Sequence, residues 1–228
     1  MTKTIDHPFA VAIDGPAGAG KSTIARALAA QLSFIYVDTG ALYRTIGLSM
    51  LTRGIDINDP AAVAASLDGI TVALRYVDGE QRVFLNGEDV SGRIRTPEVS
   101  MAASKVSAVP QVRAFLLKTQ RDMAAAQPVI MDGRDIGTTI LPNADVKIFL
   151  TASPEARAQR RFRELAEKGA PAPYDEVLRD MLQRDYDDEH RAVSPLRRAE
   201  DAVLVDTSDL TLEGSIDALR QIVTARLH

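Results

Sequence analysis

Short apolar runs alternate along this chain with longer stretches of helical periodicity. Residues 9–13 are apolar and end at Asp14 and a cluster of glycines, and a helical pattern follows over about 21–32. A second apolar run at 35–37 is closed by Asp38-Thr39-Gly40, and another helical pattern covers about 41–53. The order strand, glycine loop, helix, strand predicts a parallel α/β fold, whose sheet must be covered by helices on both faces.

The pattern changes to period two between about residues 70 and 90. Ile70, Val72 and Leu74 alternate with other residues, and Asp78-Gly79 and Asn86-Gly87 are turn signals. This predicts a small antiparallel hairpin or three-stranded sheet, inserted into the α/β frame as a subdomain of roughly 30 residues.

The rest of the chain returns to strands and helices. We expect helices from about 97 and over 110–126, strands at 129–131 and 146–150, and a helix that begins after Ser153-Pro154-Glu155 and ends at Gly169. A helix over 175–190, a strand at 203–205 and a final helix capped by Thr211 complete the prediction. The 228 residues predict one domain, or one domain with an insert.

Composition excludes several classes of site. The chain has no cysteine, which excludes disulfides, thiolate zinc sites and cysteine nucleophiles, and its three histidines are scattered. It has no apolar run of 18 residues and no signal-peptide pattern, so we expect a cytoplasmic protein with no membrane contact. A net charge of −4 and the absence of tryptophan argue against a nucleic-acid binder.

The glycine cluster fits the phosphate-binding pattern G-x-x-x-x-G-K-[ST] between a predicted strand and a predicted helix. In such a loop the backbone N–H groups converge on phosphate oxygens, Lys21 reaches the β- and γ-phosphates, and the Ser22 hydroxyl binds Mg²⁺. A dinucleotide fingerprint fits less well because Thr23 stands where that pattern requires glycine or alanine. The expected nucleotide-binding residues are Gly15, Pro16, Ala17, Gly18, Ala19, Gly20, Lys21, Ser22 and Thr23.

This loop is shared by GTPases, ATP-driven motors and small-molecule kinases. The chain has no Asn-Lys-x-Asp sequence for reading guanine; the nearest stretch, Asn143-Ala144-Asp145, lacks the lysine. A kinase also needs a second site, at which an acceptor is held against the γ-phosphate.

Arginines are the candidates for that second site. They make up 21 of the 27 basic residues, which fits either a GC-rich genome or the recognition of phosphates. Arg44 and Arg134 follow predicted strand ends, where open α/β sheets bind ligands. Two further groups lie on predicted helix faces, and each also fits an exposed charged face: Arg184, Asp188 and Arg191, spaced i, i+4, i+7, and Arg157, Arg160 and Arg161.

Charge arithmetic favours the kinase interpretation. ATP and a nucleoside monophosphate together bring roughly six negative charges, of which Mg²⁺ and Lys21 neutralise about three. Several more cations are required, and arginines retain their charge when desolvated.

Beyond the phosphate loop, the chain contains Asp38-Thr39-Gly40-Ala41-Leu42-Tyr43-Arg44, Gly87-Glu88-Asp89-Val90, Asp132-Gly133-Arg134-Asp135-Ile136-Gly137-Thr138 and Arg184-Asp185…Asp188…Arg191. With these motifs, over nearly its whole length, it resembles the bacterial cytidylate kinases, a family of P-loop nucleoside monophosphate kinases. The resemblance implies a three-layer α/β/α fold with a five-stranded parallel core sheet. Within one domain, 1–228, it implies an acceptor-binding region at 39–126, with the antiparallel insert at about 70–92, and an arginine-rich lid at 154–172.

The resemblance also assigns roles to individual residues. Lys21, Arg134 and Arg184 serve the transferring phosphoryl group, and Arg157 and Arg161 are the lid arginines. The residues implied for CMP are Thr39 and Tyr43; Arg44, Arg134 and Arg191 for its phosphate; Asp188 for its ribose; and Ser104, Arg113 and Asp135 for its base. Thr39 departs from the family, which often has serine there.

The implied reaction converts ATP and CMP or dCMP to ADP and CDP or dCDP, with Mg²⁺ as cofactor and the protein as a monomer. Asp135 suits the amino group of cytosine and would repel the carbonyl of uracil, so we expect it to reject UMP. The alternatives are a kinase of the same fold acting on UMP, AMP or an alcohol, and a nucleotide-dependent switch or RNA-binding module.

Overall fold

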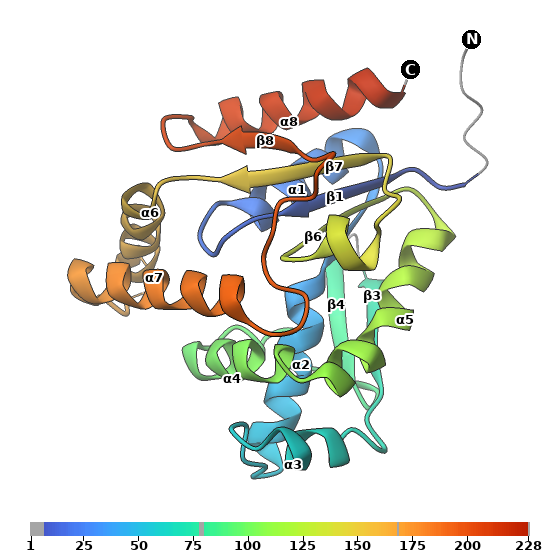
Figure 1. The fold of residues 1–228 in the computed structure, drawn as a ribbon, viewed down its shortest axis with the longest axis vertical. Coiled ribbons are helices and arrows are strands. Elements are labelled where there is room, and N and C mark those ends of the chain that lie inside the picture. The colour runs from blue at the N-terminus through green and yellow to red at the C-terminus, as the bar shows by residue number, and fades with distance from the viewer. Residues whose placement is uncertain (1–6, 78–79, 168, 228) are drawn as a thin grey trace. The chain divides into compact units, whose positions relative to one another are not determined.

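The computed structural model describes residues 7–77, 80–167 and 169–227 (Figure 1). The chain divides into two compact units: unit 1 consists of Met1–Tyr36 and Gln127–His228, and unit 2 of Val37–Ala126. The expected Asp78-Gly79 turn lies outside the described residues.

A five-stranded parallel sheet, in the order β2-β6-β1-β7-β8, organises unit 1. Its strands are β1 (Ala10–Asp14), β2 (Ile35–Asp38), β6 (Val129–Gly133), β7 (Val146–Thr151) and β8 (Val203–Asp206). The central strand β1 is buried throughout and pairs in parallel with β6 and β7. The expected α/β fold with a five-stranded parallel sheet is confirmed.

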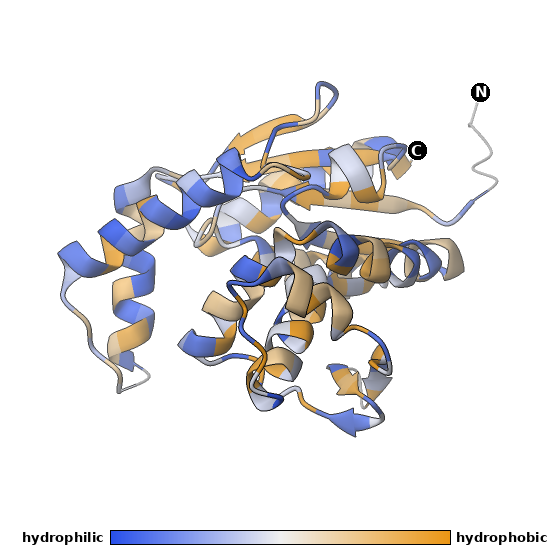
Figure 2. Cartoon of the chain, turned by 60° about the horizontal axis from the view of Figure 1, so that its bottom comes forward, coloured by the Kyte–Doolittle hydropathy of each residue, from blue (hydrophilic) through white to orange (hydrophobic). Residues whose placement is uncertain are grey.

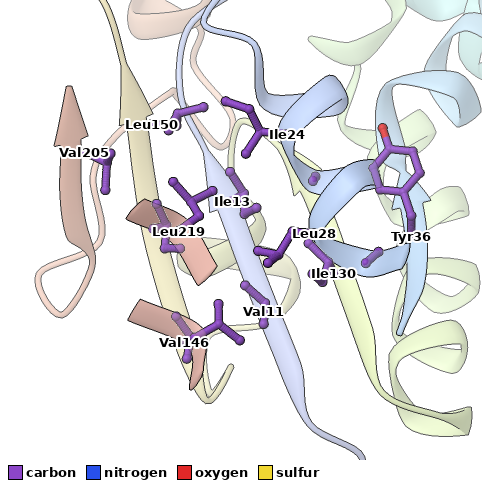
Figure 3. Packing of buried hydrophobic residues seen from close by; sticks show 14 of the residues in the cluster. Val11, Ile13, Ile24, Leu28, Tyr36, Ile130, Val146, Leu150, Val205 and Leu219 are labelled. Atoms are coloured by element: carbon purple, nitrogen blue, oxygen red, sulfur yellow. The ribbon is translucent and has the colours of Figure 1, made fainter. Parts of the chain in front are cut away.

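Helices α1 (Lys21–Leu32) and α8 (Leu212–Leu227) pack on this sheet. Their fully buried Leu28 and Leu219 meet Val11 and Ile13 of β1 in one apolar core (Figure 3). Helices α6 (Pro154–Glu167) and α7 (Tyr174–His190) are coloured largely as hydrophilic in Figure 2, whereas the core strands are mostly hydrophobic. As expected, the Ser153 hydroxyl caps α6, where it accepts a hydrogen bond from the Ala156 N–H.

Unit 2 combines four helices with a small sheet. The helices are α2 (Thr39–Thr52), α3 (Pro60–Ala65), α4 (Pro97–Ser107) and α5 (Pro110–Ala126). The sheet contains β3 (Val72–Val77), β4 (Glu80–Leu85) and β5 (Glu88–Asp89), paired antiparallel, so the three-stranded form of the expected insert is correct. Buried Leu42, Ile46, Val106 and Leu116 form its main core.

Three local features depart from the sequence-based expectations. Helix α2 begins at Thr39 rather than at 41, because the Asp38 carboxylate caps it by accepting the Ala41 N–H at 2.9 Å. The short helix α3 was not predicted, and neither was a π-helical turn, η1 (Ile136–Ile140), directly after β6. In the part of the chain that the structure describes, no helix has both the length and the apolar character needed to cross a membrane.

Candidate functional site

The loop of residues 15–20 joins β1 to α1 at the carboxyl edge of the sheet. Gly15 has φ +150°, and a Cβ there would lie 1.9 Å from the carbonyl oxygen of Leu150, so no other residue fits. Gly20 is left-handed at φ +87° and precedes α1 without any side-chain cap, and the first turn of α1 has no acidic residue. The N–H groups at this helix end are therefore open to an anion.

Lys21 is the first residue of α1, and its side chain turns back to the loop. Its ammonium group is buried and donates hydrogen bonds of 2.7 Å to the carbonyl oxygens of both Gly15 and Pro16. Burial and the positive charge of Arg134 hold the pKa of Lys21 well below its usual value. Asp132, Asp188 and Asp14 act in the opposite direction but do not outweigh the burial, so the phosphates of a nucleotide would supply further negative charge at the lysine.

Ser22 and Asp132 place a hydroxyl and a carboxylate beside the loop. The Ser22 hydroxyl donates to Asp132 Oδ2 at 2.9 Å, and the Tyr36 hydroxyl donates to Asp132 Oδ1 at 2.8 Å. The described residues contain no cluster of three His, Cys, Asp or Glu side chains, but Mg²⁺ in nucleotide sites takes only one or two protein carboxylates besides phosphate and water. A hydroxyl and a carboxylate fit that requirement.

Asp132 was missed as a functional candidate in the sequence. In the sequence it is the first residue of the Asp132-Gly133-Arg134-Asp135 turn. The signal was present, because an acidic residue directly after the buried strand at 129–131 lies at the ligand-binding edge of the sheet.

A second group of charged side chains gathers in unit 1. Arg134, just after β6, donates from Nε to Asp188 Oδ2 at 2.7 Å. Arg191 lies with Nη2 3.5 Å from Asp135 Oδ1 and with Nη1 3.9 Å from Asp188 Oδ1. The structure therefore brings together four of the residues expected to bind the acceptor.

The electrostatics of this group follow from its ion pairs. Burial alone would raise the pKa of Asp188, but the neighbouring Arg134, Arg184 and Arg191 outweigh it and lower that pKa. Burial would likewise lower the pKa of Arg134, but Asp188 and Asp132 raise it. Both groups stay charged in the folded protein.

One geometric expectation for this group is wrong. Arg184, Asp188 and Arg191 were placed on one helix face, but α7 ends at His190 and Arg191 has extended backbone at φ −60° and ψ 142°. Only Arg184 and Asp188 therefore lie one helical turn apart on α7. Arg184 is exposed, and Asp188 is buried. The Arg191 side chain approaches Asp188 from the segment that follows the helix.

The two expected lid arginines of α6 have different surroundings. Arg157 is buried, donates from Nε to the Ala152 carbonyl and from Nη1 to the Ala17 carbonyl at 2.9 Å each, and pairs with Asp185 at 2.6 Å. Arg161 is half exposed and pairs with Glu164 at 2.8 Å. The structure thus brings Arg157 into direct contact with the backbone of the phosphate loop, at Ala17.

Arg160, on the same helix, has a structural partner. It donates to the hydroxyl oxygen and the carbonyl oxygen of Thr207, just after β8. The expected common face of arginines is therefore divided among the phosphate loop, the β8 end and a local ion pair.

The remaining acceptor candidates belong to unit 2. Arg44 on α2 donates to Asp38 Oδ2 at 2.7 Å. Asp38 thus caps α2 with one carboxylate oxygen and forms an ion pair with the other. Arg113 on α5 is buried and lies 5.5 Å from the ring centre of Tyr43. Thr39 is buried at the start of α2, and Ser104 is half-buried on α4.

Four candidate arginines share one arrangement. Each lies within ion-pair distance of an aspartate: Arg44 of Asp38, Arg134 of Asp188, Arg157 of Asp185, and Arg191 of Asp135 and Asp188. These carboxylates keep the arginines oriented and neutralised. Asp38 and Asp185 were not predicted as partners of these arginines. Asp185 on α7 meets Arg157 only through the packing of α7 against α6, and Asp38 precedes Arg44 by six residues, which is not a helical pairing distance.

Comparison with known proteins finds a family model, related sequences and a solved structure of low similarity. A family model described as "Cytidylate kinase" matches residues 11–225. A cytidylate kinase of Caldicellulosiruptor bescii is 51% identical over 89% of this chain and 90% of its own, and one of Lactobacillus johnsonii is 46% identical over 97% and 96%. Among solved structures, TT1252 from Thermus thermophilus is 18% identical, with a TM-score of 0.49 over 98% of this chain and all of that one.

Proposed function

The chain belongs to the cytidylate kinase family, and on that premise we propose that it transfers the γ-phosphate of ATP to CMP or dCMP, giving CDP or dCDP and ADP. One observation in the structure carries this proposal. The phosphate loop follows β1, and the Arg134-Asp135 turn follows β6, which pairs with β1 in parallel with Asp14 opposite Gly133. A phosphate-binding loop and a second group of arginines therefore leave the sheet at one edge.

ATP is bound through its phosphates in this proposal. The N–H groups of residues 17–20 and of the first turn of α1 hold the phosphate oxygens, and Lys21 contacts the β- and γ-phosphates. Ser22 and Asp132 would hold Mg²⁺, which neutralises charge on the β- and γ-oxygens when bound. Thr23, exposed beside Ser22, lies at the same helix end.

The acceptor is bound through phosphate, ribose and base. The charged Arg134 and Arg191 of unit 1 suit the phosphate, because each can exchange an aspartate for phosphate oxygens. The family resemblance assigns Arg44 to the same phosphate. The other assignments rest on the family resemblance: Asp188 to the ribose, Arg184 beside the transferring phosphoryl group, and Thr39, Tyr43, Ser104, Arg113 and Asp135 around the nucleoside.

The transfer itself needs no strong general base, because the acceptor phosphate is already an anionic nucleophile. Catalysis then rests on in-line positioning and on neutralisation of charge by Lys21, the arginines and the metal. We place Arg157 and Arg161 in this role, with the 154–172 segment as a lid that excludes water from the reacting phosphates.

A coupled assay of ADP release tests the proposal. Purified protein with MgATP is given CMP, dCMP, UMP or AMP in parallel, and we expect CMP and dCMP to stimulate ADP release most. Faster turnover with UMP or AMP would identify a different nucleotide kinase. ATP binding without any acceptor-stimulated ADP release would favour a nucleotide-dependent switch. A single domain, a monomer, a cytoplasmic location and independence from nucleic acid stay predictions.

A further inference from the structure

Asp14 connects two parts of unit 1 that are far apart in the sequence. It is the last residue of β1, is 4% exposed, and its two carboxylate oxygens point to different backbone groups. Oδ1 accepts the N–H of Ile136 at 2.7 Å, and Oδ2 accepts the N–H of Gly137 at 2.8 Å. Charge-assisted hydrogen bonds of this length are among the strong ones in proteins.

The turn that receives these bonds depends on them. Ile136 and Gly137 begin η1, and N–H groups at the start of a helical segment have no partner within it. Asp135 occupies the cap position at φ −146°, yet its side chain makes no capping hydrogen bond. The Asp14 carboxylate, more than a hundred residues earlier in the chain, therefore accepts the hydrogen bonds that a capping side chain would accept.

Gly137 is enclosed on the other side as well. A Cβ at this position would lie 3.1 Å from Cδ of Lys147 and 3.4 Å from Oδ2 of Asp14. Lys147 is itself held by Asp201 at 2.9 Å. The start of the turn is thus clamped between a strand-end carboxylate and a lysine side chain of β7.

Asp14 lies in closely packed surroundings, and burying its carboxylate costs folding free energy. Ile13 is fully buried before it, and Gly15 after it is pressed against the backbone of Leu150. Burial raises the pKa of Asp14 to about 6, despite the two hydrogen bonds that lower it. A buried carboxylate that costs folding free energy is a feature expected of a residue kept for function.

We propose that Asp14 is a positioning residue for the acceptor nucleotide: by fixing the backbone of Ile136 and Gly137, it holds the adjoining Arg134 and Asp135 in their binding orientation. This inference rests on the proposed kinase function. It adds to that function a residue that need not contact either nucleotide. The Lys21 ammonium group donates its hydrogen bonds to the carbonyls of Gly15 and Pro16, and its electrostatic effect on the pKa of Asp14 is smaller than those of burial and the two backbone hydrogen bonds.

The test separates acceptor binding from donor binding. Asp14→Asn keeps the size of the side chain but turns one acceptor into a donor that faces a backbone N–H. We expect the KM for CMP to rise about tenfold or more, the cost of one unpaired buried N–H, with the KM for ATP within a factor of two of wild type. The preference for CMP over UMP should fall at the same time.

Two further variants make the test decisive. A Cβ in Gly137→Ala would press on the flexible Lys147 side chain by only a few tenths of an ångström, so we expect this variant to fold even where Asp14→Asn does not. It should raise the KM for CMP selectively. Asp145→Asn is the matched control, because Asp145 accepts the N–H of Ala10 at the opposite end of β1 at 2.8 Å. It should lower Tm without changing either KM.

The outcomes distinguish this inference from the proposed function. Wild-type protein without CMP-stimulated ADP release contradicts the proposed function whatever the variants do. Active wild type with an unchanged KM for CMP in the folded variants, or with equal rises for CMP and ATP, overturns the positioning role.

Discussion

The Lys21 ammonium group is the cation that the structure holds deepest in the phosphate loop. We expect Lys21→Ala to lower kcat by at least about a hundredfold, because it removes the charge that meets the β- and γ-phosphates. Circular dichroism should show an unchanged fold. Lys118→Ala, on the exposed face of α5, is the control and should keep full activity. Activity of Lys21→Ala within a factor of two of wild type would refute the role.

Asp14 also predicts a dependence of stability on pH. Its folded pKa of about 6 lies above the ordinary value of 3.8, so the folded state binds more protons than the unfolded state between these values. The free energy of unfolding therefore falls as pH rises from about 4 to 6, by about 3 kcal/mol in full, because the buried carboxyl group must then ionise. The charged groups that act on it, Asp135 and Lys21, are unchanged in Asp14→Asn.

Urea unfolding at pH 5 and pH 7.5 measures this effect. The free energy of unfolding of wild type, minus that of Asp14→Asn, should fall by about 1 kcal/mol between the two pH values. A difference that stays constant or rises would show that Asp14 does not have the raised pKa.

Asp135 predicts the choice of base. Its carboxylate, beside Arg191, suits the amino group of cytosine and repels the carbonyl of uracil. Asp135→Asn should therefore reduce the ratio of kcat/KM for CMP to that for UMP by about tenfold or more. The matched control is Asp187→Asn, an exposed carboxylate on α7. An unchanged ratio in Asp135→Asn would remove Asp135 from base recognition.

At the scale of elements, the hydrophobic pattern predicted most of the fold. The strands at 9–13 and 35–37, the helix caps at Ser153 and Thr211, and the antiparallel insert all follow from local periodicity or local capping, and the structure contains them. The turn η1 escaped prediction because the group that caps it, Asp14, is distant in sequence. Asp185, which pairs with Arg157 from another helix, escaped for the same reason, whereas Asp38 lies only six residues before its partner Arg44.

The crossing of α2 and α4 gives a prediction for unit 2. A Cβ at Gly47 would lie 2.9 Å from the backbone nitrogen of Ala103 and 3.1 Å from the side chain of Ala102, so the helices would have to move apart. Gly47→Ala gains about 1 kcal/mol of helix propensity but overpacks this crossing by about 1–3 kcal/mol. We expect a net loss of stability in urea unfolding. Gly92→Ala, with open space around its Cβ, should show none. A stabilised Gly47→Ala would contradict the close approach.

At the scale of the whole molecule, the net charge of −4 says little about a site that binds anions. Each aspartate that balances a candidate arginine removes one positive charge from the total while it keeps that arginine oriented.

The sheets of the two units differ in how deeply their strands are buried. The phosphate loop and the turn that carries Arg134 follow the largely buried strands β1 and β6, whereas the β3–β4–β5 sheet of unit 2 is partly exposed.

Hydrogen exchange of the intact protein tests this distribution. Val11, Ala12 and Ile13 are fully buried on the central strand, and β1 is paired on both sides, so their amides should exchange only in global unfolding. The β3–β4–β5 sheet ends in a two-residue strand, and Tyr76 and Val77 of β3 are exposed, so its amides should exchange through local opening and much faster. Mass spectrometry of peptides covering 9–14 and 72–77 compares the two directly. Equal protection would mean that the insert is as stable as the central sheet, and that the sheet in unit 2 does not open independently of the strands that carry the phosphate loop.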